Sequence, residues 1–169
     1  MAGERTGETV GEAQDWLSTI AQGERWHDHR AGSLRTTPQT RSVGLAAVPE
    51  SVKEARDFAL GVLGSWGLSG LDDEVRLVVS ELVTNALRYS TGSAVGSAPI
   101  KLSLLRTGGR LTCAVADPCD KIPVHREPDS ASQNGRGLHL VEAFSDSWNW
   151  APLSSRGKVV WACFLCPDW

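Results

Sequence analysis

The sequence contains no apolar run that approaches the roughly 20 consecutive residues of a membrane-spanning helix. Its first residues, MAGERTGETVGEAQDW, contain no basic segment followed by an apolar one, so no signal peptide is expected. The chain also lacks an excess of positive charge, because 17 lysines and arginines face 20 aspartates and glutamates and leave a net charge of -3 at pH 7. Nucleic-acid binding usually leaves a broad basic footprint. These absences predict a cytoplasmic protein that binds neither membranes nor nucleic acid directly.

Disulfide bonds and cysteine-based zinc sites are not expected either. The chain has 4 cysteines, and without a signal peptide they are expected to stay reduced rather than form disulfides. Cys163 and Cys166 are three residues apart on a predicted strand, so they face opposite sides and do not form the turn that a zinc site needs. The composition, 41% hydrophobic and 22% charged over 169 residues, is that of one globular domain with a short appendage.

The appendage is the N-terminal segment 1–40, which is poor in large apolar side chains and is interpreted as a flexible arm. Within it, five residues follow the spacing of an amphipathic helix: Ala13, Trp16, Leu17, Ile20 and Ala21. This short helix either packs on its own domain, which is the favoured reading, or docks a partner or a second subunit.

Residues 41–169 carry periodic patterns that predict a regular order of elements. Helices are expected over 49–66, 72–87 and 137–144, and strands over 41–48, 100–104, 111–117, 148–151 and 158–165. The order predicts an α+β fold with helices on one face of a mostly antiparallel sheet. The segment 118–136 contains three prolines and no periodic pattern, and a loop of this length is typical of a lid or an insert.

Two polar residues stand out on the second predicted helix. Glu81 and Asn85 are four residues apart, so both lie on one face of a helix that is otherwise strongly apolar. A carboxylate and an amide on a mostly buried helix need partners, because an unpaired buried charge is costly. The alternative reading is a solvated stripe along one side of the helix.

Two further motifs lie at element ends. Asp117 ends a strand, where it accepts hydrogen bonds from a ligand amine or, in the simpler reading, forms a turn before Pro118. The run Asn134-Gly135-Arg136-Gly137-Leu138 begins a helix, and its backbone N–H groups suit a phosphate. The simpler reading of this run is a glycine-rich turn.

Taken in order, these motifs resemble the GHKL ATPase family. The segments that carry the resemblance are VSELVTNALRYS (79–90), VAD (115–117), GRGLHLVEAFSDSW (135–148) and GKVVW (157–161). Within the family they look like the small anti-sigma-factor serine kinases, and the resemblance covers about residues 41–166. It implies the Bergerat fold, a two-layer α/β sandwich with helices on one face of a mostly antiparallel mixed sheet. This fold recognises phosphates without a Walker sequence, and none is present here.

The resemblance also implies roles for individual residues. Glu81 matches the general base that takes a proton from the attacking hydroxyl. Asn85 matches the asparagine that coordinates Mg²⁺, and Asp117 matches the acid that accepts the adenine amino group of ATP. The other residues implied to bind the nucleotide are Gly135, Arg136, Gly137 and Leu138, with Thr84 and Arg88 flanking the helix face.

The chain departs from the family pattern at two boxes. The first glycine box of the family has glycines where this chain has Cys119 and Lys121. In the last box, Val159 stands where a threonine often helps to bind adenine.

The resemblance implies an anti-sigma factor and serine-protein kinase. Such a protein binds ATP and Mg²⁺, sequesters a sigma factor and phosphorylates an anti-sigma-factor antagonist. A homodimer is expected, because this group commonly dimerises. The missing glycines and Val159 motivate an alternative, a non-catalytic interaction module of the same fold.

Overall fold

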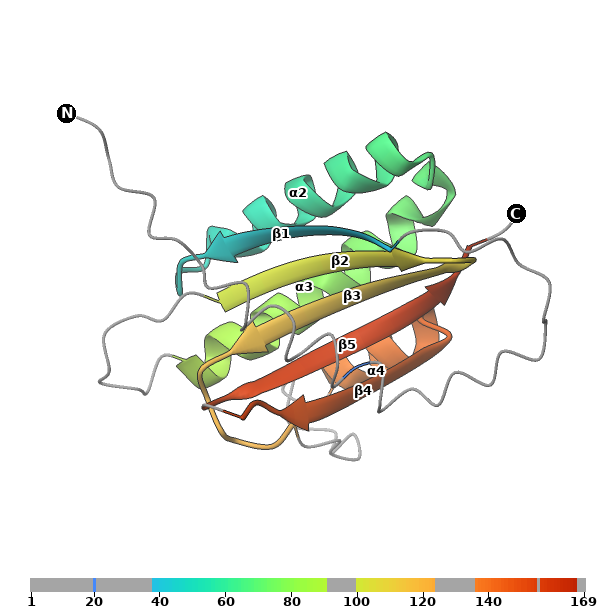
Figure 1. Cartoon of the computed structure of the whole chain (residues 1–169). Coiled ribbons are helices and arrows are strands. Elements are labelled where there is room, and N and C mark those ends of the chain that lie inside the picture. Colours follow the sequence, from blue (N-terminus) through green and yellow to red (C-terminus); the bar gives the residue numbers. More distant parts are fainter. Residues whose placement is uncertain (1–19, 21–37, 91–99, 124–135, 155, 167–169) are drawn as a thin grey trace.

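The computed structural model describes residues 20, 38–90, 100–123, 136–154 and 156–166, and shows five strands packed against a layer of helices (Figure 1). In chain order, the elements are β1 (Gln39–Leu45), α2 (Ser51–Trp66), the 3-10 turn η1 (Ser69–Leu71), α3 (Asp72–Ser90), β2 (Ile100–Thr107), β3 (Arg110–Asp117), α4 (Arg136–Phe144), β4 (Ser147–Pro152) and β5 (Lys158–Leu165). The predicted α+β two-layer sandwich is therefore confirmed.

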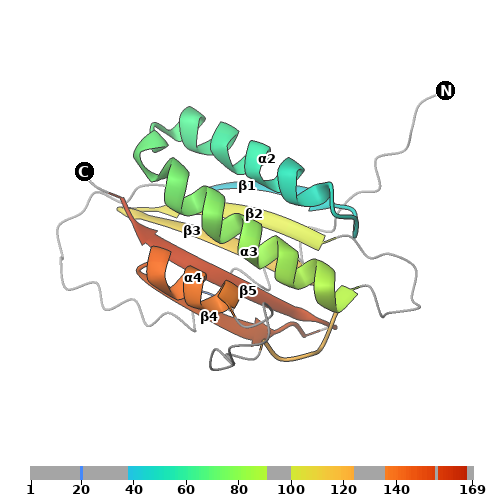
Figure 2. The ribbon, with the colours of Figure 1, turned by 180° about the vertical axis from the view of Figure 1, so that it is seen from behind.

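The helices lie on one face of the sheet, with α3 between α2 and α4 (Figure 2). Their apolar stripes explain this arrangement. On α3, Val75, Val78, Val79, Leu82 and Val83 follow helical spacing and are at most 2% exposed. Because such a stripe covers one side of a helix, burying it on the sheet leaves the opposite side for solvent. The helix α3, which lies in the middle of the helical layer, is thus held in place by the main core.

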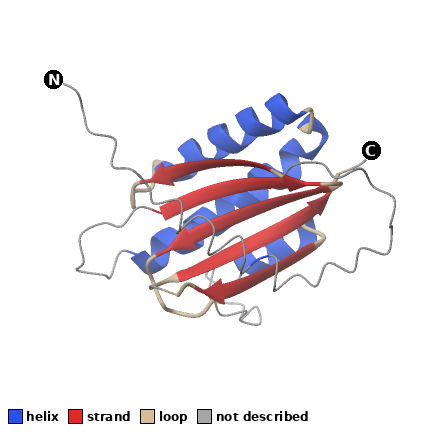
Figure 3. Cartoon of the chain, in the orientation of Figure 1, coloured by secondary structure: helices blue, strands red, loops and turns tan. Residues whose placement is uncertain are grey.

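The sheet has the strand order β1-β2-β3-β5-β4, and each described pairing is antiparallel (Figure 3). The β2–β3 hairpin turns at Gly108, whose φ of 57° lies in the left-handed region that glycine adopts readily. In the register of β3 with β5, Asp117 stands opposite Lys158. Residues directly opposite in a sheet project to the same face, so this register brings two charged side chains together.

The boundary between α2 and α3 follows the signals in the sequence. Gly67 ends α2 with a φ of 70°, and the N–H of Leu68 donates to the carbonyl of Leu63 at 2.9 Å. The Arg106 guanidinium of β2 donates to the carbonyl of Trp66 at 2.8 Å and so pairs another carbonyl at this helix end. These bonds fix where α2 ends.

The face of the sheet that the helices leave uncovered carries a second apolar cluster. It consists of Ala114, Val159, Trp161 and Cys163 from the strands together with Ile20, which is 1% exposed. Apart from Ile20, the helix expected at residues 13–21 lies outside the described residues. Cys163 belongs to this cluster whereas Cys166 packs against the core under the helices, which confirms that the two thiols face opposite sides.

Among the described residues, no helix is both long enough and apolar enough to cross a bilayer. The same residues include no group of three or more histidines, cysteines, aspartates and glutamates arranged to hold a metal ion.

Candidate functional site

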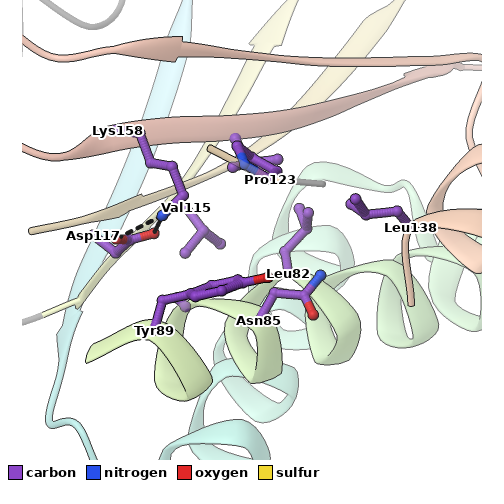
Figure 4. Close-up of a pocket in the computed structure, with 10 residues that line it drawn as sticks. Leu82, Asn85, Tyr89, Val115, Asp117, Pro123, Leu138 and Lys158 are labelled. Carbon is purple, nitrogen blue, oxygen red and sulfur yellow. Dashed lines mark hydrogen bonds and ion pairs between the residues drawn. The ribbon is translucent and has the colours of Figure 1, made fainter. Parts of the chain in front are cut away.

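A cavity lies between α3, the end of β3, the start of β5 and the first turn of α4 (Figure 4). Its lining combines an apolar floor with a few polar groups, which is the usual composition of a small-molecule site. The lining residues are Leu82, Asn85, Ala86, Tyr89, Val115, Asp117, Pro123, Leu138, Lys158 and Val160.

The face of α3 that lines the cavity follows from helical periodicity. Leu82, Asn85, Ala86 and Tyr89 lie at i, i+3, i+4 and i+7, so they form one stripe along the cavity wall. Glu81 lies one turn before Asn85 and beside the start of α4. The stripe thus places an amide at the cavity and a carboxylate next to it.

Gly137 lets the start of α4 approach these two polar residues closely. A Cβ added at Gly137 would lie 2.7 Å from Glu81 Oε2 and 3.4 Å from Asn85 Oδ1. The N-terminus of a helix carries partial positive charge and unpaired N–H groups, both of which favour an anion. Glu81, Asn85 and the first turn of α4 therefore meet at one place, as the sequence motifs predict.

This meeting point fits a magnesium–phosphate group. Mg²⁺ retains several waters and takes one or two protein oxygens together with phosphate oxygens. The Asn85 side-chain oxygen is such a ligand, and the backbone at Gly137 leaves a space that a side chain would fill. The Asn85 oxygen would therefore suit a magnesium ion that is shared with a phosphate.

Asp117 and Lys158 form a buried ion pair at the other end of the cavity (Figure 4). Lys158 Nζ lies 3.0 Å from Asp117 Oδ2, and it donates to Asp117 Oδ1 and to the carbonyl of Cys119, both at 3.1 Å. The Cys119 N–H also donates to Asp117 Oδ1 at 2.8 Å. The Lys158 and Asp117 side chains are 4% and 2% exposed, so water reaches neither of them readily.

Two influences act in opposite directions on the Asp117 carboxyl. Burial raises its pKa, while the Lys158 ammonium and the Cys119 N–H lower it, and the net direction is upward. The ammonium of Lys158 also lies 5.2 Å from the centre of the Tyr89 ring, within the range of a cation–π contact. Lys158 thus joins the strand side of the cavity to α3.

The chain before β5 holds Lys158 in this position. Gly157 has a φ of 90°, and a Cβ there would overlap the carbonyl oxygen of Asp117. The Gly157 N–H donates to Asp120 Oδ1 at 2.6 Å, and Arg156 Nε lies 3.9 Å from Asp120 Oδ2. Only glycine allows this approach, which fixes the end of β3 against the start of β5.

The other predicted site residues differ in how they stand to the cavity. Leu138 lines it, whereas Thr84 and Arg88 do not belong to its lining, and Arg88 is exposed. Arg136 is the first residue of α4, but the position of its side chain is outside the described part of the structure. Gly135 and the segment 124–135 of the predicted lid also lie outside it, while Pro123 lines the cavity.

The last box of the motif requires a correction. Val159 stands where the family pattern often has a threonine that helps to bind adenine, but Val159 is fully buried in the cluster on the opposite face of the sheet. Lys158 is the residue of this box that enters the cavity. Strand alternation could have shown this, because Val160 faces the helices and a residue two positions earlier must share its face.

These features define an ATPase-type sandwich. A carboxylate at the end of β3, an amide on α3 and the start of α4 surround one cavity. Residues 45–164 match the family of histidine kinase-like ATPase domains, and the chain belongs to this family. No curated protein matches the chain.

A solved structure shares the fold. It is a chain from the crystal structure of the SiaB–SiaC complex from Pseudomonas aeruginosa, which is 13% identical in sequence. The match covers 89% of the present chain and 99% of that chain, with a TM-score of 0.52. At this level of identity, the likeness establishes a common fold.

Proposed function

We propose that the protein is an ATP-binding anti-sigma factor and serine-protein kinase. The observation that carries this proposal is the meeting of Glu81, Asn85 and the start of α4 beside the cavity that contains Asp117. A carboxylate at this point can receive a proton, while an amide oxygen and helical N–H groups beside it suit a metal-bound phosphate. This combination supports phosphoryl transfer better than passive binding.

Each residue has a separate task in this proposal. ATP, bound with Mg²⁺, supplies the phosphoryl group. Glu81 takes the proton from a serine hydroxyl of the substrate protein, and the Asn85 oxygen holds Mg²⁺ in position. Asp117 accepts a hydrogen bond from the amino group of the adenine ring. Gly137 and Leu138 present backbone N–H groups at the phosphates, joined by Gly135 and Arg136.

The partners we propose are proteins. They are a sigma factor, which the protein sequesters, and an antagonist, which receives the phosphate on a serine. The name of the structure that shares the fold describes a SiaB–SiaC complex, so that protein is seen in a protein–protein assembly. We further propose a cytoplasmic homodimer.

The experiment that tests catalysis compares two glutamates of α3. The partner that co-purifies with the chain is incubated with Mg·ATP labelled at the γ-phosphate, and serine phosphorylation is measured. Glu81→Gln keeps the shape of the side chain but removes the base, so transfer should fall at least about a hundredfold while nucleotide binding survives. Glu74→Gln, in the first turn of α3, is the control and should transfer normally. Transfer by Glu81→Gln at the unmodified rate would remove Glu81 as the base.

One observation favours a second candidate function, a non-catalytic interaction module. The Asp117 carboxylate, which is expected to accept the amino group of adenine, is already paired with Lys158. In such a module, the same fold would hold a partner with little or no nucleotide. Calorimetric titration separates the two candidates, because no heat of binding at millimolar Mg·ATP would contradict the kinase and support the module.

A further inference from the structure

We infer that Lys158 competes with the nucleotide base for Asp117, so that a base binds this carboxylate at the expense of the Lys158 ion pair. This inference rests on the proposed function, because it concerns the cavity that would hold ATP. It makes Lys158 a residue that sets nucleotide affinity, a role that neither its family nor its sequence motif assigns.

The hydrogen-bonding capacity of the pair carries the inference. An ammonium has three donors and no acceptor. Lys158 Nζ donates two of them, to Asp117 Oδ1 and to the Cys119 carbonyl, both at 3.1 Å, and it lies 3.0 Å from Asp117 Oδ2 in the ion pair. These contacts hold the ammonium against both oxygens of the carboxylate that is proposed to accept the amino group of adenine.

The carboxylate is similarly committed. Asp117 Oδ1 accepts from both the Cys119 N–H and Lys158, and Oδ2 lies within ion-pair distance of the same ammonium. The Asp117 side chain is only 2% exposed, so its carboxylate is held mainly by these protein contacts. A base that approaches Asp117 therefore competes at both oxygens with an ammonium whose bonds are charge-assisted and stronger than neutral ones.

A purely structural role for the pair is the main alternative. The pair does connect the end of β3 to the start of β5, but the bond from the Gly157 N–H to Asp120 and the backbone ladder already connect them. Lys158 and Asp117 line the cavity instead of lying within the core. A structural role predicts that replacing Lys158 changes stability and leaves nucleotide affinity unaltered.

The test replaces the ammonium with a chain of similar length. Lys158→Met should bind Mg·ATP about tenfold to a hundredfold more tightly than the unmodified protein in calorimetry, because the base no longer displaces a charge-assisted bond. In either protonation state, Asp117 keeps an oxygen that accepts an amino hydrogen. Lys53→Met, which removes an exposed ion pair of α2, is the control and should leave the affinity unchanged.

A second ligand locates the effect within the cavity. Mg·tripolyphosphate carries the phosphates but no base, so it should bind Lys158→Met and the unmodified protein equally. Equal or weaker binding of Mg·ATP by Lys158→Met would overturn the inference, as would a gain that appears equally with tripolyphosphate.

The unmodified protein gives an independent answer if Lys158→Met does not fold. Amine labelling followed by mass spectrometry should modify Lys158 slowly in the ligand-free protein and faster with millimolar Mg·ATP. Labelling of Lys158 that does not change with nucleotide would overturn the inference.

The outcomes separate the inference from the kinase proposal. If Lys158→Met binds Mg·ATP tightly and the unmodified protein shows no detectable binding, the result supports the inference about Lys158 and contradicts the kinase proposal. Equal binding by both leaves the kinase standing and removes the competitor. Binding by neither contradicts both.

Discussion

Gly137 determines how closely the start of α4 approaches Glu81 and Asn85. A methyl group there would lie 2.7 Å from Glu81 Oε2, so the carboxylate must move aside in a Gly137→Ala variant. Displacement of a reacting group by about 1 Å can cost about a hundredfold in rate. We expect Gly137→Ala to lose phosphoryl transfer by a factor of that order while its thermal unfolding changes little, because the glutamate side chain is able to rotate.

The matched control for Gly137→Ala is Gly61→Ala on α2. No atom lies within 4 Å of a Cβ at Gly61, and alanine within a helix is favoured over glycine by roughly 0.5–1 kcal/mol. Gly61→Ala should therefore keep normal transfer and raise the unfolding temperature slightly. Normal transfer by Gly137→Ala in the same assay would show that Glu81 does not need its present position.

The Asp117–Lys158 pair also predicts a dependence of stability on pH. Burial raises the pKa of the Asp117 carboxyl above its ordinary value, so the folded state holds this proton more tightly than the unfolded state. The contribution of Asp117 to stability is therefore greatest below the ordinary carboxyl pKa and is lost as pH rises through the raised one.

Removing Lys158 removes an influence that lowers this pKa, so the pKa should rise further in Lys158→Met. Breaking a buried pair from one side costs about 3–5 kcal/mol. We expect a loss of this order at a pH above the raised carboxyl pKa, and a smaller loss as the pH falls through that pKa, because the protonated carboxyl pairs less strongly with Lys158. Urea unfolding at pH values above and below that pKa measures the difference. A loss that grew on acidification would contradict this assignment.

At the scale of elements, Gly157 controls how β5 begins beside the end of β3. Alanine at Gly157 would combine a φ of 90° with overlap of its Cβ and the Asp117 carbonyl. A residue other than glycine in the left-handed region costs about 1–2 kcal/mol, and crowding adds about 1–3 kcal/mol. Gly157→Ala should therefore lower the free energy of unfolding by about 2–5 kcal/mol, measured by chemical denaturation.

A Gly108→Ala variant separates the cost of the left-handed backbone conformation from the cost of the close contact. Gly108 also has a positive φ, 57°, but no atom lies within 4 Å of its Cβ position. Its replacement should cost only the backbone part, about 1–2 kcal/mol. Equal losses at the two glycines would mean that the close approach at Gly157 contributes nothing.

The elements themselves could be predicted because their signals are local. Gly67 ends α2, the acidic run at 72–74 begins α3, and glycines mark the β2–β3 turn. The pairing of Asp117 with Lys158 is different in kind. It depends on the register between β3 and β5, which are 41 residues apart at this point and are separated by α4 and β4. No local pattern specifies such a register, so the sequence could place Lys158 on the cavity face by strand alternation but could not identify Asp117 as its partner.

At the scale of the molecule, the helices α2, α3 and α4 cover one face of the sheet (Figure 2), while the other face carries the cluster that contains Ile20. Strand residues on this second face are almost completely buried, with Ser103, Thr112 and Trp161 at 1–2% exposure. Among the described residues, Ile20 is the buried member of the cluster on this face that comes from outside the sheet. The arm is thus expected to pack on its own domain through Ile20.

Cysteines on the two faces make this expectation measurable. Cys163 is 1% exposed in the cluster with Ile20, whereas Cys113 is fully buried under the helices. Replacing a buried isoleucine with alanine removes packing worth about 2–5 kcal/mol. In Ile20→Ala, alkylation of Cys163 in the folded protein should therefore become at least about tenfold faster, while Cys113 stays protected and reports that the main core is intact. Unchanged labelling of Cys163 would show that Ile20 does not hold the cover of this face, and parallel labelling of both thiols would instead indicate global unfolding.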